Sequence, residues 1–327
     1  MVYLGPGGRI LTARSMDWAT EIGTDLWVFP RGIERSGQTG EKTVRWTSKY
    51  GSVTASAFNI ATSDGLNEKG LSANLLWLAE SEYTPWTGEK PGISIAIWAQ
   101  YVLDNFATVA EAVAALEEES FVVLTSTLPD SDRMATVHLS ISDASGDSAI
   151  FEYVDGKLVI HHGRQYQVMT NSPTFDQQLA ISSYWGEIGG TVMLPGTNRA
   201  ADRFARSNFY INAIPRVEDR RAATAAVFSV IRNVSVPIGI TTPDQPNISS
   251  TRWRTVADHK DLIYYFESAV TPNVFWVDLK DLDLEPGAPV RVLRLGPDQR
   301  ETFAGEVSDE FRPSEPFTFM RVDPEAE

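Results

Sequence analysis

The stretch Ala13-Arg14-Ser15-Met16-Asp17-Trp18 lies close to the start of this 327-residue chain, at the end of an apolar run that begins at Ile10. Another apolar run, Val2-Tyr3-Leu4, precedes it, and Gly5-Pro6-Gly7-Gly8 separates the two. A Gly/Pro cluster between short apolar runs predicts a β-hairpin. The arginine and the aspartate of the quoted stretch therefore follow the first strand, where they could support a nucleophile at the chain terminus.

Composition limits the classes of partner. Hydrophobic residues make up 43% of the chain, which is enough for a sizeable core. The 28 basic and 43 acidic residues give a net charge of −15, which argues against a nucleic-acid partner. No apolar run approaches the roughly 20 residues of a membrane helix, so no membrane partner is expected. The absence of cysteine excludes disulfides and thiolate metal sites within these residues.

The opening residues, Met-Val-Tyr-Leu-Gly, lack the basic and apolar regions of a signal peptide. A leader removed by processing would leave the same pattern. We expect a periplasmic location for a longer parent protein with a leader, and a cytoplasmic location if Met1 is the true start.

Alternating and helical spacing predict a chain that mixes strands and helices. Strands are expected over 2–4, 10–13, 46–60, 71–78, 137–141, 148–154, 158–161 and 251–277. Helices are expected over 93–106, 108–116, 199–214 and 217–233. The segment from Asp64 to Gly70 is predicted to be a turn, and the Pro- and acid-rich tail from Ser308 to Glu327 is expected on the surface.

The order of these elements indicates the fold class. Two blocks of strands are each followed by a pair of helices, and no linker divides the chain. Two sheets packed face to face with helices outside satisfy this order. We predict an α+β fold, a four-layer αββα sandwich, formed by residues 1–327 as one domain. A two-domain α+β protein is the alternative.

Common catalytic and metal-binding motifs are absent: there is no P-loop, no His-Glu-x-x-His and no Gly-x-Ser-x-Gly. The chain has four histidines. His161 and His162 are adjacent on a predicted strand, so they would point to opposite faces. We therefore predict no metal site, no Ser-His-Asp triad and no cofactor.

Four motifs occur in order along the chain: Arg14-Ser15-Met16-Asp17-Trp18, Asp64 to Leu71, Met169-Thr170-Asn171-Ser172-Pro173-Thr174-Phe175-Asp176, and Asp202-Arg203-Phe204-Ala205-Arg206. With these motifs the chain resembles the choloylglycine hydrolase family, which holds penicillin V acylases and bile salt hydrolases. The resemblance extends from the first strand to the C-terminal strands. It implies an N-terminal-nucleophile hydrolase with an αββα fold, a small-molecule acyl-amide substrate and a homotetramer.

In that family a cysteine becomes the first residue after processing. Its thiolate attacks an amide carbonyl, and its own α-amine, which titrates near ~8, serves as the base. The family's opening, Cys-Thr-Arg-Phe, precedes the strand that begins here at Val2, so the cysteine would fall about three residues before Met1. Ser15 and Thr12 are poor substitutes because they are not terminal and lack a base. The resemblance thus implies that the chain as written is inactive.

The resemblance also implies a role for each matching residue. Arg14 would favour the thiolate, Asp17 would orient the α-amine, Asn171 would donate to the oxyanion, and Arg203 would complete the polar network. Each residue also has a purely structural interpretation. Arg14 and Asp17 could form a surface pair, Asn171 could start a turn, and Arg203 could solvate a helix.

One position departs from the bile salt hydrolase pattern. There an Asn follows a Gly-Leu pair, whereas Leu75-Leu76-Trp77-Leu78 places Trp77 at that position. A backbone N–H or Trp77 Nε1 would then complete the oxyanion site. The departure is similar to the Gram-negative penicillin V acylases, which also cleave N-acyl homoserine lactones, and it argues against bile salts as main substrate. About half of Trp18, Trp27, Trp77 and Trp86 should line an apolar acyl pocket, and the others would be core.

The sequence and the resemblance therefore predict a linear-amide hydrolase of penicillin V acylase type, with N-acyl homoserine lactones as a further substrate class. A non-catalytic member that binds acyl amides and a bile salt hydrolase are the alternatives. If the assignments hold, Arg14, Asp17, Asn171 and Arg203 converge at one end of a cleft near Met1.

Overall fold

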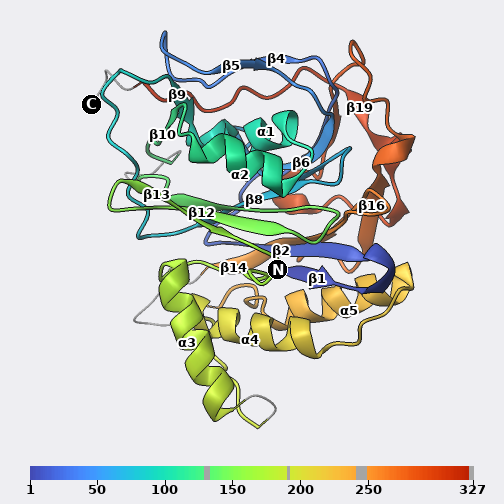
Figure 1. The fold of residues 1–327 in the computed structure, drawn as a ribbon. Helices are drawn as coiled ribbons and strands as arrows, with labels where there is room; N and C mark the ends of the chain where they lie inside the picture. The colour runs from blue at the N-terminus through green and yellow to red at the C-terminus, as the bar shows by residue number, and fades with distance from the viewer. Residues whose placement is uncertain (129–132, 190–191, 241–248, 324–327) are drawn as a thin grey trace.

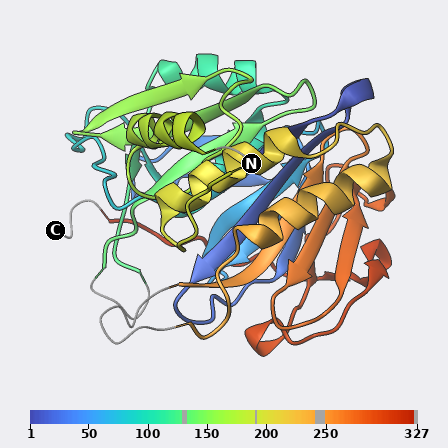
Figure 2. The same ribbon diagram turned by 90° about the horizontal axis from the view of Figure 1, so that it is seen from below.

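The computed structural model describes residues 1–128, 133–189, 192–240 and 249–323. Two β-sheets pack face to face, and helices cover the outer face of each sheet (Figures 1 and 2). This arrangement gives four layers in the order α, β, β, α. The predicted α+β class and the αββα sandwich are confirmed.

The helices of the described ranges form two groups. They are α1 (Ile95–Asn105), α2 (Val109–Glu117), α3 (Phe175–Ile188), α4 (Ala200–Ala213) and α5 (Arg220–Asn233). The first two helices cover one sheet, and the last three lie below the other sheet in Figure 1. Within the described ranges, no helix is long and apolar enough to cross a membrane.

The strands divide into two large sheets and two short pairs. In spatial order, the six-stranded sheet contains β1 (Val2–Leu4), β2 (Ile10–Trp18), β14 (Ser250–Asp258), β15 (Ile263–Ser268), β16 (Val274–Asp278) and β18 (Gly305–Glu306). The nine-stranded sheet contains β13 (Lys157–His162), β12 (Ser148–Val154), β11 (Val137–Ser142), β8 (Ser72–Trp77), β7 (Ala61–Asn67), β6 (Ser52–Ala57), β3 (Leu26–Phe29), β17 (Arg291–Leu293) and β19 (Arg312–Pro313). The short pairs are β4 (Glu34–Ser36) with β5 (Arg45–Thr47), and β9 (Gly92–Ser94) with β10 (Val122–Leu124).

Three hydrophobic clusters hold the layers together. Between the sheets, Met16 of β2 and Trp253 of β14 pack with Val28, Val53 and Phe266. A second cluster joins α1 and α2 to β8, β11 and β12. A third joins α4 and α5 to β1, β2 and β14. Each sheet therefore buries both faces, which explains why its strands are more apolar than strict alternation requires.

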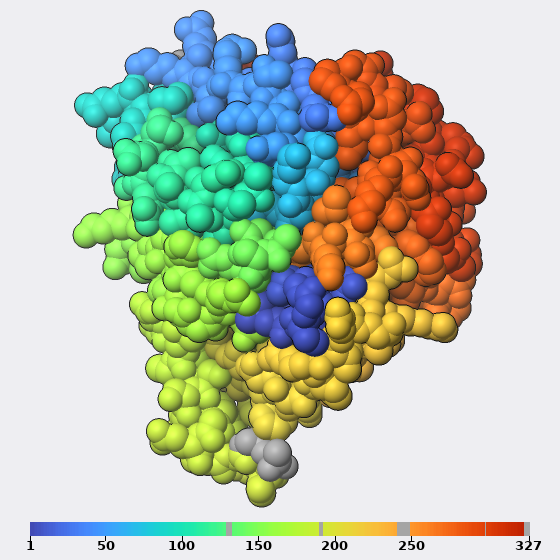
Figure 3. All heavy atoms as spheres, turned by 45° about the vertical axis from the view of Figure 1, so that its right-hand side comes forward, coloured from blue at the N-terminus to red at the C-terminus, as the bar shows by residue number. Residues whose placement is uncertain are grey.

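The N-terminal hairpin has the predicted form. Val2 lies opposite Thr12 in an antiparallel register, and the turn between the strands uses Gly7 and Gly8 at φ values of 59° and 72°. Glycine tolerates such positive φ values without strain. β2 continues to Trp18 in the interior of the sheet, paired with β14 on its other side. Figure 3 shows the start of the chain, in dark blue, at the surface between the green strands and the yellow helices.

Two predicted boundaries need correction. Asp64 was expected in a turn, but it lies within β7, opposite Asn74 of β8. The turn itself is shorter and follows Asn67, whose side-chain Oδ1 accepts from the backbone N–H groups of Lys69 and Leu71, each at 3.0 Å. Asp64 belongs to the strand because its carboxylate has buried partners between the sheets.

The C-terminal tail also differs from expectation. Phe311, Phe319 and Val322 are buried, and Phe317 packs its ring against Trp27 at 5.2 Å. The tail therefore adds to the core instead of lying only on the surface, and residues 324–327 lie outside the described part. Helix α3 was not predicted. Its buried residues are only Phe175 and Gln178, so its sequence carries almost no apolar periodicity.

A buried histidine ties three parts of the fold together. His259 follows β14, and its Nδ1 lies 2.7 Å from Gly70 O, while Nε2 lies 2.7 Å from Thr12 Oγ1. Because a carbonyl oxygen only accepts, Nδ1 carries the proton and Nε2 accepts from the hydroxyl. Burial lowers the pKa of His259, so the folded protein holds the ring uncharged.

This histidine should weaken the fold in acid. The ordinary pKa of a histidine is about 6.5. As the pH falls below this value, His259 takes up a proton in the unfolded chain but not in the folded one. The free energy of unfolding then decreases by up to about 1.4 kcal/mol per pH unit. The free energy of unfolding, measured with urea between pH 8 and pH 5, should therefore decrease more steeply in the original protein than in His259→Gln. His162→Gln on the edge strand β13 serves as the control and should keep the steep loss. Parallel curves for the original protein and His259→Gln would contradict this account.

Candidate active site

Arg14 is buried between the two sheets although it carries a charge, and the residue is 5% exposed. Its Nη1 donates to Ser63 O at 2.5 Å and Nη2 donates to Leu75 O at 3.0 Å, so the side chain links β2 to β7 and β8. Asp64 Oδ2 lies 3.7 Å from Nη1, and the guanidinium carbon lies 4.9 Å from the Trp253 ring centroid. These contacts compensate for lost hydration, since a buried charge is costly unless it is paired and hydrogen-bonded.

Asp64 was not assigned a role from the sequence, yet it is the carboxylate that faces Arg14. Burial raises the pKa of Asp64, while Arg14 and the hydroxyls of Tyr264 and Thr255 oppose that shift. Tyr264 Oη donates to Asp64 Oδ1 at 2.5 Å and Thr255 Oγ1 donates to Oδ2 at 3.2 Å. Burial also lowers the pKa of Arg14, and Asp64 opposes this shift. The guanidinium stays cationic because arginine does not lose its proton in proteins.

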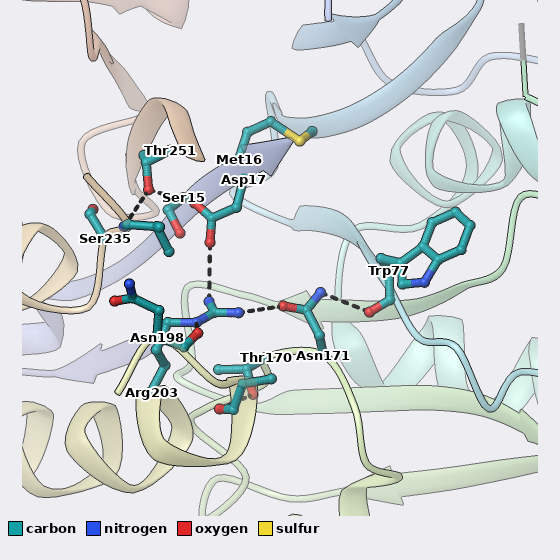
Figure 4. Close-up of polar contacts among 12 residues, drawn as sticks. Ser15, Met16, Asp17, Trp77, Thr170, Asn171, Asn198, Arg203, Ser235 and Thr251 are labelled. Carbon is teal, nitrogen blue, oxygen red and sulfur yellow. Dashed lines mark hydrogen bonds and ion pairs between the residues drawn. The ribbon is translucent and has the colours of Figure 1, made fainter. Parts of the chain in front are cut away.

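A continuous hydrogen-bonded chain runs through Asp17, Arg203 and Asn171 (Figure 4). Asp17 Oδ1 accepts from Thr251 Oγ1 at 2.6 Å, and Asp17 Oδ2 accepts from Arg203 Nη1 at 3.2 Å. Arg203 Nη2 donates to Asn171 Oδ1 at 2.7 Å, and Asn171 Nδ2 donates to Trp77 O at 2.7 Å. Strands β2, β8 and β14 therefore meet α4 and the segment before α3 at one point.

This chain orients the amide of Asn171. Its oxygen faces the Arg203 guanidinium, which fixes the nitrogen on the other side. An amide nitrogen carries two hydrogens, and Trp77 O accepts one of them. The second hydrogen remains available to an acceptor in the adjoining cavity. Trp77 thus contributes its main-chain carbonyl here, and its buried Nε1 has no hydrogen-bond partner among the described residues.

An apolar cavity of about 140 Å³ opens beside these side chains. Arg14, Asp17, Asn171 and Arg203 all line it, so the four residues converge as the sequence predicted. The rest of its wall is mostly apolar and includes Met16, Trp18, Phe58, Ile60, Leu128 and Met320. A pocket with a few polar groups at one end suits a ligand that has an apolar body and one polar group.

Only two of the four tryptophans considered from the sequence line this cavity. They are Trp18 and Trp77, whose rings lie 5.8 Å apart. About half of the set was expected to line a pocket, and Trp27 and Trp86 are the two that do not line this one. Trp27 lies in β3 beside β17, where its ring packs with Phe29 and with the C-terminal tail. Trp86 packs against the cluster of β10 and the tail, and the sequence gives no signal that separates these positions.

A narrower cavity of about 40 Å³ adjoins Met1 and is also lined by Arg14, Ser15 and Arg203. Met1 N donates to Ala13 O and Ala13 N donates to Met1 O, each at 2.8 Å, so the β1–β2 ladder continues to Met1. Burial lowers the pKa of the Met1 α-amine to about 5. In the chain as given, this amine is therefore uncharged at neutral pH.

A wider and more polar hollow, of about 510 Å³, shares part of its wall with the apolar cavity. The shared residues are Asp17, Trp18, Trp77, Asn171 and Arg203. The hollow adds Thr197, Asn198 and Arg199, which precede α4. Asn171 and Arg203 thus border an apolar and a polar compartment at once. In the described part of the chain, no three His, Asp or Glu side chains are grouped to hold a metal ion.

Comparison with known proteins agrees with this geometry. Residues 6–292 match the family of linear amide C–N hydrolases, choloylglycine hydrolase family. Penicillin V acylase of Pectobacterium atrosepticum is 57% identical, in an alignment that covers 97% of this chain and 90% of that protein. The structure of penicillin V acylase from Agrobacterium tumefaciens matches with a TM-score of 0.92 and 62% identity, over 98% of this chain and 99% of that chain.

A more distant structure shares the fold. A variant of conjugated bile acid hydrolase from Clostridium perfringens matches with a TM-score of 0.76 and 23% identity, over 90% of this chain and 96% of that chain. The matched family covers most of the chain, and the chain covers nearly all of the two penicillin V acylases. The chain therefore belongs to the choloylglycine hydrolase family of linear amide C–N hydrolases.

Proposed function

We propose that this protein forms a penicillin V acylase-type site that requires a cysteine placed three residues ahead of position 1. The observation that carries the proposal is the Asp17–Arg203–Asn171 chain at the polar end of an apolar cavity. None of the 327 residues is a cysteine. We therefore infer that the chain as given binds acyl amides without hydrolysing them.

The register of the N-terminal hairpin supports this position for the nucleophile. Val2 lies opposite Thr12, and Met1 pairs with Ala13. In the same antiparallel register, a residue three positions ahead of Met1 lies opposite Met16, about 10 Å further along the strand. Opposed residues point to the same face, so its side chain would project beside Arg14 and Met16, toward the apolar cavity.

The surrounding groups suit each step of amide hydrolysis. Arg14 would favour the thiolate, because a nearby cation lowers the pKa of a thiol. Asp17 would hold the terminal amine, which takes the thiol proton and later gives it to the leaving amine. The sulfur forms a bond to the acyl carbon, and the C–N bond breaks. The free N–H of Asn171 would donate to the oxyanion, and water then hydrolyses the thioester.

The two compartments suggest how a substrate lies. The apolar cavity fits an aryl or fatty acyl group between Trp18, Phe58 and Leu128. The polar hollow beside Asn198 and Arg199 would receive the leaving amine. Penicillin V fits this division, and we extend the proposal to long-chain acyl homoserine lactones. Bile salts are not proposed as main substrates, since Trp77 replaces the Asn of that subgroup. A homotetramer and a periplasmic parent protein also remain proposals by family resemblance.

Extension of the chain tests the nucleophile directly. Replacing Met1 by Cys-Thr-Arg-Phe, with the cysteine exposed as the first residue, should produce hydrolysis of penicillin V or of a long-chain acyl homoserine lactone. The chain as given should release no 6-aminopenicillanic acid above a buffer control, because nothing in it replaces the thiolate. Amine release measured by a fluorogenic label would report both results.

A Ser-Thr-Arg-Phe extension is the matched control, since it has the same length and no thiol. It should be at least about a hundredfold slower than the cysteine form. Hydrolysis by the chain as given would refute the cysteine nucleophile. A correctly processed cysteine form that stays inert toward penicillin V, acyl homoserine lactones and conjugated bile salts alike would refute the proposed function.

Asn171 gives a second test within the Cys-extended protein. Asn171→Ala should lower kcat by about 10²–10³-fold with a smaller effect on KM, because its N–H acts mainly on the oxyanion. Steady-state kinetics with penicillin V measure the two constants. Asn208→Ala on the outer part of α4 is a suitable control and should leave both unchanged. If Asn171→Ala instead raised KM by a similar factor and left kcat constant, Asn171 would act in ground-state binding.

A further inference from the structure

A buried His–Glu pair lies behind the site, and none of the steps above uses it. His138 of β11 is 0% exposed and Glu152 of the neighbouring β12 is 1% exposed. His138 Nδ1 lies 2.9 Å from Glu152 Oε1, and Nε2 lies 2.8 Å from Thr170 O. Glu152 Oε2 accepts from Phe175 N at 3.0 Å. Both ring nitrogens of His138 and both carboxylate oxygens of Glu152 therefore have a hydrogen-bond partner.

The partners of the pair fix its proton count. Thr170 O only accepts, so His138 Nε2 must carry a proton. A further proton lies between Nδ1 and Oε1, whichever of the two atoms holds it. Removing either side chain would leave a buried acceptor or donor without a partner, which destabilises the segment that the pair holds. A buried pair of this kind is therefore expected where the segment that it binds must be held in one position.

The two ends of the held segment bracket Asn171. His138 binds the carbonyl of Thr170, the residue just before Asn171, and Glu152 binds the N–H of Phe175, at the start of α3. Figure 4 shows Thr170 directly beside Asn171 and below Arg203. Between the two ends, Gln178 Nε2 donates to Asn171 O, and to Pro173 O at 2.6 Å.

The segment therefore owes its placement to two strands of the nine-stranded sheet. Thr170 Oγ1 donates to Gln178 Oε1 at 2.7 Å, which closes the network around it. Arg203 and Trp77 orient only the end of the Asn171 side chain. The backbone around it is held by the His138–Glu152 pair at both ends and by Gln178 between them.

We propose that His138, held by Glu152, is a positioning residue for the oxyanion donor Asn171 and acts through the carbonyl of Thr170. This inference rests on the proposed function for its catalytic consequence. An oxyanion donor must lie within about half an ångström of its productive place. A pair that fixes the adjacent carbonyl thus controls transition-state stabilisation without touching the substrate.

Hydrogen–deuterium exchange on the chain as given tests the positioning itself. His138→Leu should raise deuterium uptake several-fold in peptides that cover 169–178 and leave β14 and β15 unchanged. Glu152→Gln is the matched control. Its amide can accept from Phe175 N and donate to Nδ1 of a neutral His138, so all three hydrogen bonds survive and uptake should stay as in the original protein.

Kinetics in the Cys-extended protein test the route through Asn171. His138→Leu should lower kcat about 10–100-fold with KM within about threefold, as is typical of residues that orient a functional group. Glu152→Gln should stay within about threefold of the parent. Adding His138→Leu to Asn171→Ala should cause no further loss of kcat, because the positioned donor is already gone.

The outcomes separate this inference from the proposed function. Unchanged exchange at 169–178, or a rise throughout both sheets, would overturn the positioning role whether or not the extended protein is active. Losses of kcat that multiply in the double variant would also overturn it. An inert Cys-extended parent would refute the proposed function, while the exchange data still decide what holds the segment. If His138→Leu does not fold, His138→Gln, which keeps one of the two bonds, should give a smaller rise at the same peptides.

Discussion

The burial of one cation, Arg14, constrains the rest of the structure. A guanidinium between two sheets needs acceptors, and the sheet opposite β2 provides them. β7 and β8 give the carbonyls of Ser63 and Leu75, and β7 also gives the carboxylate of Asp64. Each of these contacts fixes the nine-stranded sheet against β2. A shift of one sheet against the other would leave the charge unpaired, which costs several kcal/mol. Arg14 also lines the apolar cavity, so the contacts that align the sheets lie at the cavity wall.

The other site residues depend on that alignment in turn. Asp17 is one strand step beyond Met16 and faces the helical side of its sheet, where Arg203 of α4 meets it. Arg203 then donates to Asn171, whose side chain donates to Trp77 O in the opposite sheet. The polar chain thus crosses from one sheet to the other around the edge of β2. A site assembled from both sheets forms only after the whole fold has formed, which separates it from sites carried by a single loop.

The sequence predicted the parts that carry local signals. The Gly5–Gly8 turn, the period-two strands and the helices α4 and α5 follow from short patterns. The convergence of Arg14, Asp17, Asn171 and Arg203 was implied by the family resemblance. Prediction from the sequence failed where long-range contacts decide. Asp64 looked like a turn residue because its buried partners, Arg14, Thr255 and Tyr264, come from distant parts of the chain. Phe317 of the tail was expected on the surface because Trp27, against which its ring packs, is nearly 300 residues away in the sequence. Helix α3 carries too few buried positions to show a period.

The alternation of side chains along β1 sets the spacing that an added nucleophile needs. Residues on that strand that oppose even-numbered positions of β2 face the gap between the sheets, and those that oppose odd-numbered positions face the helices. A cysteine opposite Met16 therefore points at the cavity, whereas a cysteine one position nearer to Val2 or one position farther from it points at α4. An extension that is one residue too short or too long would leave a folded protein with its thiol on the wrong face of the sheet.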